Sequence, residues 1–327
     1  MFDIKKFINC IFSSKLKNFD ELALDAFHYQ YNNNDVYNEY CKLVGVLDNN
    51  TIKNLSQIPF IPIEFFKNKS ILLNQKKSEI IFESSGETKS KHFVADIEIY
   101  KKSFFKGFEL FYGDIETYCF LALLPSYLER ENSSLVYMCK QLITTSKHKL
   151  SGFYLNEFDN LKQNLMQLKA QNQKTILLGA TFALLDFVEE YSIDFPELIV
   201  METGGMKGRR KEITRPEVHE YLKKSFRVSN IHSEYGMTEM LSQAYAKQDG
   251  KFESPPWVKV FTTEINDVFS KTLNAKNGII NVIDLANIYS CCFLKTSDIG
   301  KVFDDETFEV LGRLDNSDLR GCSLLTI

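Results

Sequence analysis

Short apolar runs that end in loops of glycine and small polar residues are the feature that most constrains this chain. Residues 80–84 lead into a Ser-Ser-Gly loop, residues 197–202 lead into a Thr-Gly-Gly loop, and a Glu-Tyr-Gly segment follows a third predicted strand. Strands that alternate with helices predict an α/β fold with a largely parallel sheet and flanking helices. Because ligands bind at the carboxyl ends of such strands, we expect the three loops to share a site.

The predicted elements divide the chain into three parts. Residues 1–75 form a mostly helical N-terminal segment, residues 76–255 carry the α/β core, and residues 256–327 form a small β-rich subdomain. Apolar periodicity and run length predict the individual elements. Helices are expected over 19–31, 134–142 and 215–224, and strands over 80–84 and 119–125. The run 175–190 is expected to form a strand, a glycine turn and then a helix, and the run 197–205 a strand that leads into a glycine loop. Short β segments are expected over 257–265, 278–285, 292–296 and 301–311.

Composition excludes several classes of protein. The net charge of −4 gives no basic field for nucleic acid. No apolar stretch reaches the roughly 18 residues of a membrane span, and the start of the chain lacks a secretory signal. Seven cysteines without a regular spacing predict free thiols in a reducing cytoplasm. No zinc-type cysteine or histidine spacing and no G-x-S-x-G elbow is present.

Two loops have the chemistry to bind a nucleotide phosphate. Residues 84–91, Ser-Ser-Gly-Glu-Thr-Lys-Ser-Lys, combine hydroxyls, a glycine and lysines, although the P-loop spacing is absent. Residues 234–239, Glu-Tyr-Gly-Met-Thr-Glu, join a hydroxyl donor to Glu239, a carboxylate suited to a hard cation. An ordinary turn is the alternative interpretation of each loop. The Thr-Ser-Asp-Ile-Gly segment at 296–300 by itself resembles a hairpin turn.

The order of these motifs resembles that of the adenylate-forming enzymes, the superfamily of acyl-CoA synthetases, adenylation domains and luciferases. The resemblance covers about residues 60–325 and includes Gly-Arg-Leu-Asp at 312–315. It implies the fold of the large N-terminal domain of those enzymes and the use of ATP and Mg²⁺ to form an acyl-AMP.

The resemblance also implies roles for individual residues. The triphosphate loop would comprise Ser84, Ser85, Gly86, Thr88 and Lys89, and the adenine would meet Gly204, Gly205, Tyr235 and Gly236. The phosphates, the metal and the ribose would be bound by Thr238, Glu239, Asp298 and Arg313. His232 corresponds to a position that often contacts the acyl pocket, and a packed histidine is an equal alternative.

Cys322, in the segment Arg-Gly-Cys at 320–322, most resembles the acylated cysteine of the acyl-protein synthetases of bacterial luminescence. The form Glu-Thr-Gly-Gly-Met-Lys-Gly-Arg at 202–209 is similar to the same branch. A thiolate can attack the mixed anhydride of an acyl-AMP and form a thioester. The sequence stops near the hinge of the superfamily, without its C-terminal lid. We therefore expect the lid's lysine to be replaced by Lys89, Lys91, Lys295 or Arg313, or by a partner.

These observations predict an ATP-dependent acyl-protein synthetase. It would activate a carboxylic acid, for which we expect a fatty acid, and pass the acyl group through Cys322 to a reductase or transferase partner. The altered loop at Glu87 and the absent lid disfavour an ordinary CoA ligase. Two alternatives remain open: a ligase that acylates a diffusible thiol such as CoA or a carrier arm, and a non-catalytic nucleotide- or acyl-binding module.

Overall fold

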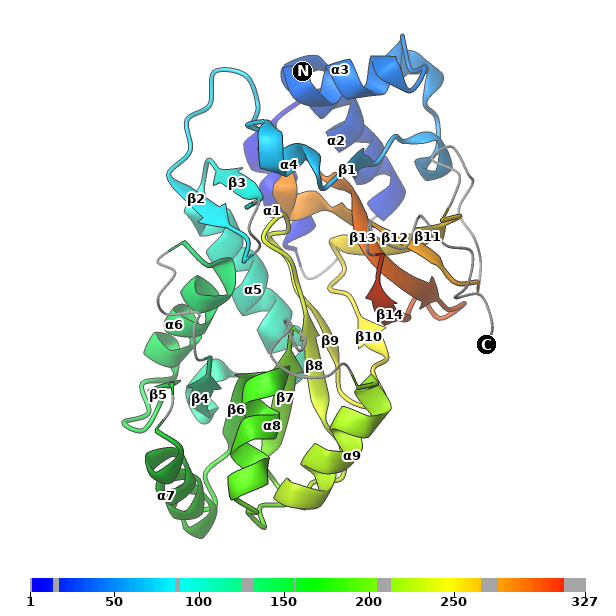
Figure 1. The fold of residues 1–327 in the computed structure, drawn as a ribbon. Coiled ribbons are helices and arrows are strands. Elements are labelled where there is room, and N and C mark those ends of the chain that lie inside the picture. Colours follow the sequence, from blue (N-terminus) through cyan, green and yellow to red (C-terminus); the bar gives the residue numbers. More distant parts are fainter. Residues whose placement is uncertain are drawn as a thin grey trace. The chain divides into compact units, whose positions relative to one another are not determined.

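The computed structural model describes residues 2–13, 18–85, 89–124, 132–155, 157–204, 213–265 and 276–314. They form two compact units, one of residues 1–80, 86–96 and 256–327, the other of residues 81–85 and 97–255. The predicted α/β fold is confirmed (Figure 1). The predicted division into parts at residues 75 and 255 stays a prediction. Within the described residues, no helix has the length and apolar character needed to cross a membrane.

The second unit is built on one sheet whose strand order is β5-β4-β6-β7-β8-β9-β10. The first five strands are parallel, and the last two pair antiparallel. Its strands are β4 (Cys119–Leu123), β5 (Gly152–Tyr154), β6 (Thr175–Ala180), β7 (Ile199–Thr203), β8 (His232–Tyr235), β9 (Ala244–Ala246) and β10 (Phe252–Glu253). Every residue of β4 and β6 is buried, as expected for parallel strands covered on both faces.

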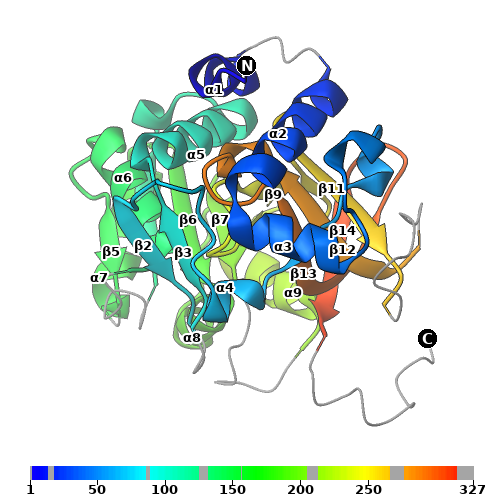
Figure 2. The ribbon, with the colours of Figure 1, turned by 90° about the horizontal axis from the view of Figure 1, so that it is seen from above.

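Helices cover both faces of this sheet. They are α5 (Ile97–Tyr112), α6 (Ser134–Ser146), α7 (Phe158–Ala170), α8 (Thr181–Glu190) and α9 (Arg215–Phe226), with a 3₁₀ turn η3 (Ile115–Thr117). Figure 2 shows α5 and α6 on one face of the sheet, opposite α8 and α9. The predicted helices at 134–142 and 215–224 are confirmed, as is the helix expected in the later part of 175–190, whereas α5 and α7 were not predicted.

Helix α9 begins where its sequence provides a capping box. The side chain of Thr214 accepts a hydrogen bond from the backbone of Glu217, and the Glu217 carboxylate accepts one from the Thr214 backbone N–H. Pro216 occupies the first turn, where its missing N–H costs nothing. This cap fixes the residue at which the helix begins, and therefore the position of Arg215.

The first unit contains an antiparallel sheet in the order β11-β12-β13-β14, with β1 added parallel to β13. These strands are β1 (Ile61–Pro62), β11 (Val258–Thr263), β12 (Gly278–Asp284), β13 (Phe293–Val302) and β14 (Phe308–Arg313). The helices of this unit are α1 (Ile4–Ile11), α2 (Phe19–Asn33), α3 (Asp35–Leu43) and α4 (Phe65–Asn68). Its 3₁₀ turns are η1 (Asn49–Thr51), η2 (Leu55–Gln57) and η4 (Leu285–Asn287). Strand β3 (Lys91–Val94) belongs to the same unit, and β2 spans Ile80–Glu83.

A buried polar side chain fixes α2 to the turn between β12 and β13. The amide nitrogen of Gln30 donates to the carbonyls of Asn287 and Ile288, and its oxygen accepts from the backbone of Cys292. Gln30 is fully buried, so these bonds satisfy a side chain that would otherwise be costly to bury. Beside it, the ring of Tyr37 stacks on Phe293 with centroids 5.9 Å apart.

The segment at 296–300 is strand, which corrects the interpretation of Thr-Ser-Asp-Ile-Gly as a turn. Strand β13 runs through it to Val302, and the turn lies after Phe303. The register between β13 and β14 shifts at Ile299 and Gly300. A Cβ placed on Gly300 would clash with the carbonyl oxygen of Glu309 and lie 2.5 Å from Ile280 Cδ1. Only glycine fits at this irregularity.

We predict that Gly300→Ala lowers the free energy of unfolding by about 2 kcal/mol, because the added methyl group overpacks the bulge. The matched control is Gly312→Ala on the facing strand, where a Cβ would have no neighbour within 4 Å. Chemical denaturation of both variants checks the prediction. Equal midpoints for the two variants would contradict it.

Candidate nucleotide site

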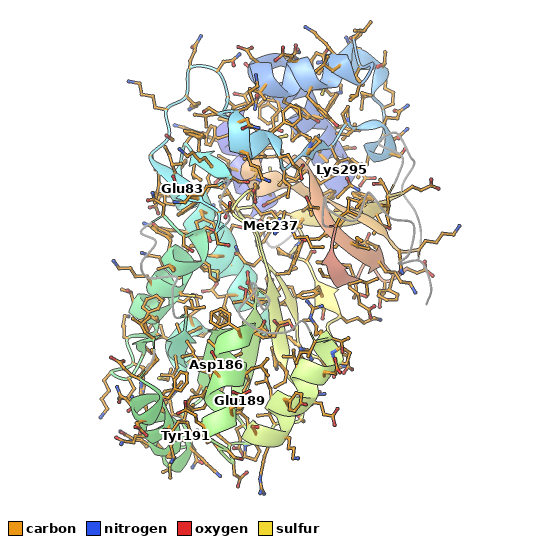
Figure 3. All side chains as sticks on the ribbon, viewed as in Figure 1. Glu83, Asp186, Glu189, Tyr191, Met237 and Lys295 are labelled. Atoms are coloured by element: carbon orange, nitrogen blue, oxygen red, sulfur yellow. The ribbon has the colours of Figure 1, made fainter. Side chains whose placement is uncertain are left out.

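Two of the predicted nucleotide loops lie at one edge of the parallel sheet. Strands β7 and β8 pair in register, with Thr203 opposite Glu234. The next residues are therefore neighbours at the carboxyl ends of the two strands: Gly204 on one, Tyr235 and Gly236 on the other. Met237 lies beyond the end of β8, whereas Asp186 and Glu189 on α8, and Tyr191 just after this helix, lie away from this edge (Figure 3). The expected grouping of these two loops is supported.

A hydrogen bond between buried side chains joins the two strand ends. Thr203 Oγ1 donates to Glu234 Oε2 at 2.5 Å. On the other side of this carboxyl group, a Cβ at Gly236 would lie 2.8 Å from Glu234 Oε1 and 3.4 Å from Gln243 Cγ. Glycine at position 236 is thus needed for the backbone to pass close to the carboxyl group.

Burial controls the ionisation of Glu234. Desolvation raises its pKa to about 7, the hydrogen bond from Thr203 opposes the rise, and the nearby charge of Glu202 adds to it. Glu202 behaves in the opposite way. Burial alone would raise its pKa, but hydrogen bonding from His219 and the charge of Arg215 hold the pKa below its usual value. The strand ends therefore contain one carboxyl group whose pKa is lowered and one that titrates near neutral pH.

The residues after β8 form a compact turn. The backbone N–H of Met240 donates to the carbonyl of Met237 at 3.1 Å, which places Thr238 and Glu239 in the turn. Glu239 is buried, with 5% of its surface exposed, and Thr238 is partly exposed. The ring of Tyr235 contacts that of Phe252, with the two ring centroids 5.8 Å apart.

Glu239 fits a magnesium site of the kind that binds nucleotides. Mg²⁺ usually takes one or two carboxylates and completes its shell with phosphate oxygens and water. Among the described residues, no three histidine, cysteine or acidic side chains are grouped as a cage for a metal. A single carboxylate, that of Glu239 after β8, matches a Mg²⁺ ion that takes its other ligands from phosphate and water.

Asp298 and Arg313, the two candidate ribose ligands, are directly opposite each other on β13 and β14. Arg313 Nε lies 3.8 Å from Asp298 Oδ1, with 66% and 15% of the two side chains exposed. Because the arginine of this pair is mostly exposed, the pair contributes little to stability. A carboxylate has the chemistry to accept hydrogen bonds from a vicinal diol. Sequence reasoning singled out both residues but did not anticipate their pairing.

The structure describes only some of the remaining predicted site residues. Ser84 and Ser85 follow β2, and Lys89 is exposed before β3. Gly86, Thr88, Gly205 and Cys322 lie outside the described residues.

His232 and five of the six described cysteines are packed in the protein. Tyr112 Oη lies 3.1 Å from His232 Nδ1, and desolvation lowers the pKa of this histidine to about 4, so it is neutral. Burial raises the thiol pKa of Cys41 to about 12 and of Cys119 to about 11. It also raises the thiol pKa of Cys139, Cys291 and Cys292. Thiols held neutral in this way are poor nucleophiles.

Comparison with known proteins decides the family. The model of the family described as "Acyl-protein synthetase, LuxE" matches residues 8–326. The chain belongs to this family. It is accordingly an enzyme of the ligase type, as the sequence predicted.

Two curated relatives carry the name long-chain-fatty-acid–luciferin-component ligase. The protein from Vibrio harveyi is 25% identical over 93% of this chain and 85% of its own length. The protein from Aliivibrio fischeri is 22% identical over 93% of this chain and 86% of its own length.

Solved adenylate-forming enzymes share the fold. A 2-hydroxyisobutyryl-CoA ligase in the postadenylation state, in complex with 2-HIB-AMP, aligns with a TM-score of 0.64 and 11% identity, covering 91% of this chain and 68% of the other. ATP-bound MatB from Rhodopseudomonas palustris aligns with a TM-score of 0.55 and 15% identity, covering 74% of this chain. The chain spans about half the length of MatB, since 49% of that protein is covered.

We predict that Glu234 makes stability depend on pH. Its folded pKa of about 7 lies above the ordinary 4.5. The contribution of Glu234 to the free energy of unfolding is therefore fully present below pH 4.5 and is lost as the pH rises through 7. Relative to Glu234→Gln, which stays neutral, the wild-type protein should lose about 3 kcal/mol of unfolding free energy between pH 4.5 and pH 8.

Denaturant titrations at a series of pH values measure this difference. Glu220→Gln, an exposed position on α9, is the control and should follow the wild-type curve. A constant difference between wild type and Glu234→Gln across the range would show that the carboxyl group is not protonated in the folded protein.

Proposed function

We propose that this chain is an ATP-dependent acyl-protein synthetase that activates a fatty acid as acyl-AMP and transfers the acyl group to Cys322. The observation that carries the proposal is the register of β7 and β8. It supports a nucleotide site at Gly204, Tyr235 and Gly236 in a chain whose family match extends over residues 8–326. The names of the curated relatives support a long-chain fatty acid as the substrate class.

Each candidate residue has a role that its chemistry suits. Tyr235 packs beside the adenine, Gly204, Gly205 and Gly236 let the backbone approach the base, and Asp298 accepts the ribose hydroxyls. Thr238 donates to the α-phosphate, and Glu239 would hold a Mg²⁺ ion, which would supply positive charge to the phosphates. The triphosphate is bound by Ser84, Ser85, Gly86 and Thr88, with positive charge from Lys89 and Arg313.

The first half-reaction joins the acid to AMP. A carboxylate oxygen of the fatty acid attacks the α-phosphorus of ATP, the bond from that phosphorus to the β-phosphate oxygen breaks, and pyrophosphate leaves. Hydrogen bonding from Thr238 stabilises the charge that develops on the α-phosphate. This step needs no cysteine and is reversible, so it can be followed by exchange of labelled pyrophosphate into ATP.

In the second half-reaction the Cys322 thiolate attacks the acyl carbonyl carbon. The bond from this carbon to the phosphate oxygen breaks, AMP leaves, and a thioester remains on Sγ. The raised thiol pKa values of the five buried cysteines disfavour them as nucleophiles. The thioester is then available to a reductase or transferase partner.

We predict that Cys322→Ser abolishes covalent labelling by a radioactive fatty acid and ATP but retains pyrophosphate exchange within about threefold, because only the second half-reaction uses the thiol. Labelling of the wild type should be released by hydroxylamine, as expected of a thioester. Peptide mapping by mass spectrometry identifies the labelled residue.

Cys10→Ser is the matched control, since Cys10 is the one described cysteine that is partly exposed. This variant should label as the wild type does. Unchanged labelling of Cys322→Ser would remove Cys322 from the proposal, and CoA-dependent release of AMP by that variant would instead indicate a diffusible thiol acceptor. A wild-type protein that exchanges no pyrophosphate with any fatty acid would contradict the adenylation step.

A further inference from the structure

Arg215 links the two ends of the segment that follows β7. Glu202 is near the end of β7, and Arg215 is the first residue of α9, so the two residues lie on either side of the segment that joins β7 to α9. Arg215 Nε lies 3.3 Å from Glu202 Oε1, with 29% and 5% of their side chains exposed. Thr181 Oγ1 donates to the other carboxylate oxygen at 2.8 Å. A carboxylate this buried requires a cationic partner, and an arginine stays charged at every physiological pH.

The same guanidinium group also contacts an aromatic ring. Its Cζ atom lies 5.3 Å from the ring centroid of Phe252 on β10, within the range of a cation–π interaction. The side-chain stem packs on Gly250, where a Cβ would lie 3.0 Å from Arg215 Cδ. Gly250 has a φ of +66°, a left-handed conformation that glycine adopts without strain.

Phe252 in turn contacts the residue proposed to pack on the adenine. Its ring, 1% exposed, lies 5.8 Å from that of Tyr235 at an interplanar angle of 60°. A continuous series of contacts therefore runs from Glu202 on β7 through Arg215 and Phe252 to Tyr235 on β8. Arg215, which belongs to neither strand, thus contacts Glu202 on β7 directly and Tyr235 on β8 through Phe252.

We propose that Arg215 is a positioning residue for the nucleotide site, which holds the Gly204 end of the segment after β7 and the ring of Tyr235 in the arrangement that binds the adenine. This inference rests on the proposed function, because it assumes that Tyr235 meets the adenine. Arg215 acts through Glu202 and Phe252, not by contact with the reacting atoms. Its loss should therefore weaken nucleotide binding more than it slows chemistry.

The test compares three variants by pyrophosphate exchange and by calorimetric titration with Mg-ATP. Arg215→Met, which keeps the stem and loses the charge, should raise the KM for ATP roughly tenfold and leave the KM for the fatty acid within about twofold. Arg215→Lys should recover part of the loss, because it keeps the charge without the planar group. Phe252→Leu leaves the pair with Glu202 intact and should raise the KM for ATP about threefold.

Lys224→Met is the control, because Lys224 is exposed in the last turn of the same helix. A wholly structural role for Arg215 would lower the melting temperature and affect both substrates alike. The inference is wrong if Arg215→Met binds ATP as the wild type does, or if the KM values for ATP and acid rise equally. Should Arg215→Met fail to fold, Arg215→Lys and Phe252→Leu decide by the same criterion.

The wild-type measurements separate this inference from the proposed function. Wild-type protein that binds Mg-ATP without exchanging pyrophosphate contradicts the proposed adenylation, while the affinities of the variants for ATP still decide the role of Arg215. Wild-type protein that exchanges pyrophosphate, together with variants of unchanged ATP affinity, contradicts only the positioning role.

Discussion

The parallel pairing of β7 with β8 is the constraint on which the candidate site depends. Because Thr203 pairs with Glu234, the two strands end side by side, and Gly204 lies next to Tyr235 and Gly236. The hydrogen bond from Thr203 to Glu234 strengthens this register at the last paired residues. Because a slip by one residue would turn every side chain to the other face, the register and the site are specified together.

Two buried carboxyl groups at these strand ends have different environments. Glu202 has a lowered pKa, because it accepts hydrogen bonds from His219 and Thr181 and lies beside the charge of Arg215, whereas burial raises the pKa of Glu234 to about 7 despite the hydrogen bond from Thr203. Two ionised carboxylates on neighbouring buried strands would repel each other strongly. Protonation of Glu234 removes that repulsion while the hydrogen bond from Thr203 persists.

Much of the fold was predictable because its signals are local. A few consecutive residues carry each of these signals: the apolar run at 119–123, the proline in the first turn of α9, and the glycine after β7. Helix α5 also has a local signal, since its buried residues recur at three- and four-residue spacing, although this helix was not among those predicted. The pairs formed by Asp298 with Arg313 and by Glu202 with Arg215 were not predictable, because they depend on a strand bulge and on tertiary packing.

The central claim is that the loops after β7 and β8 bind the nucleotide of an acyl-AMP. The most direct measurement is a crystal structure of the protein with a non-hydrolysable fatty-acyl adenylate analogue, in which a sulfamate replaces the phosphate. The account predicts the adenine beside Gly204 and the ring of Tyr235, and the sulfamate at Thr238. An analogue bound elsewhere, with these side chains in contact only with protein, would contradict it.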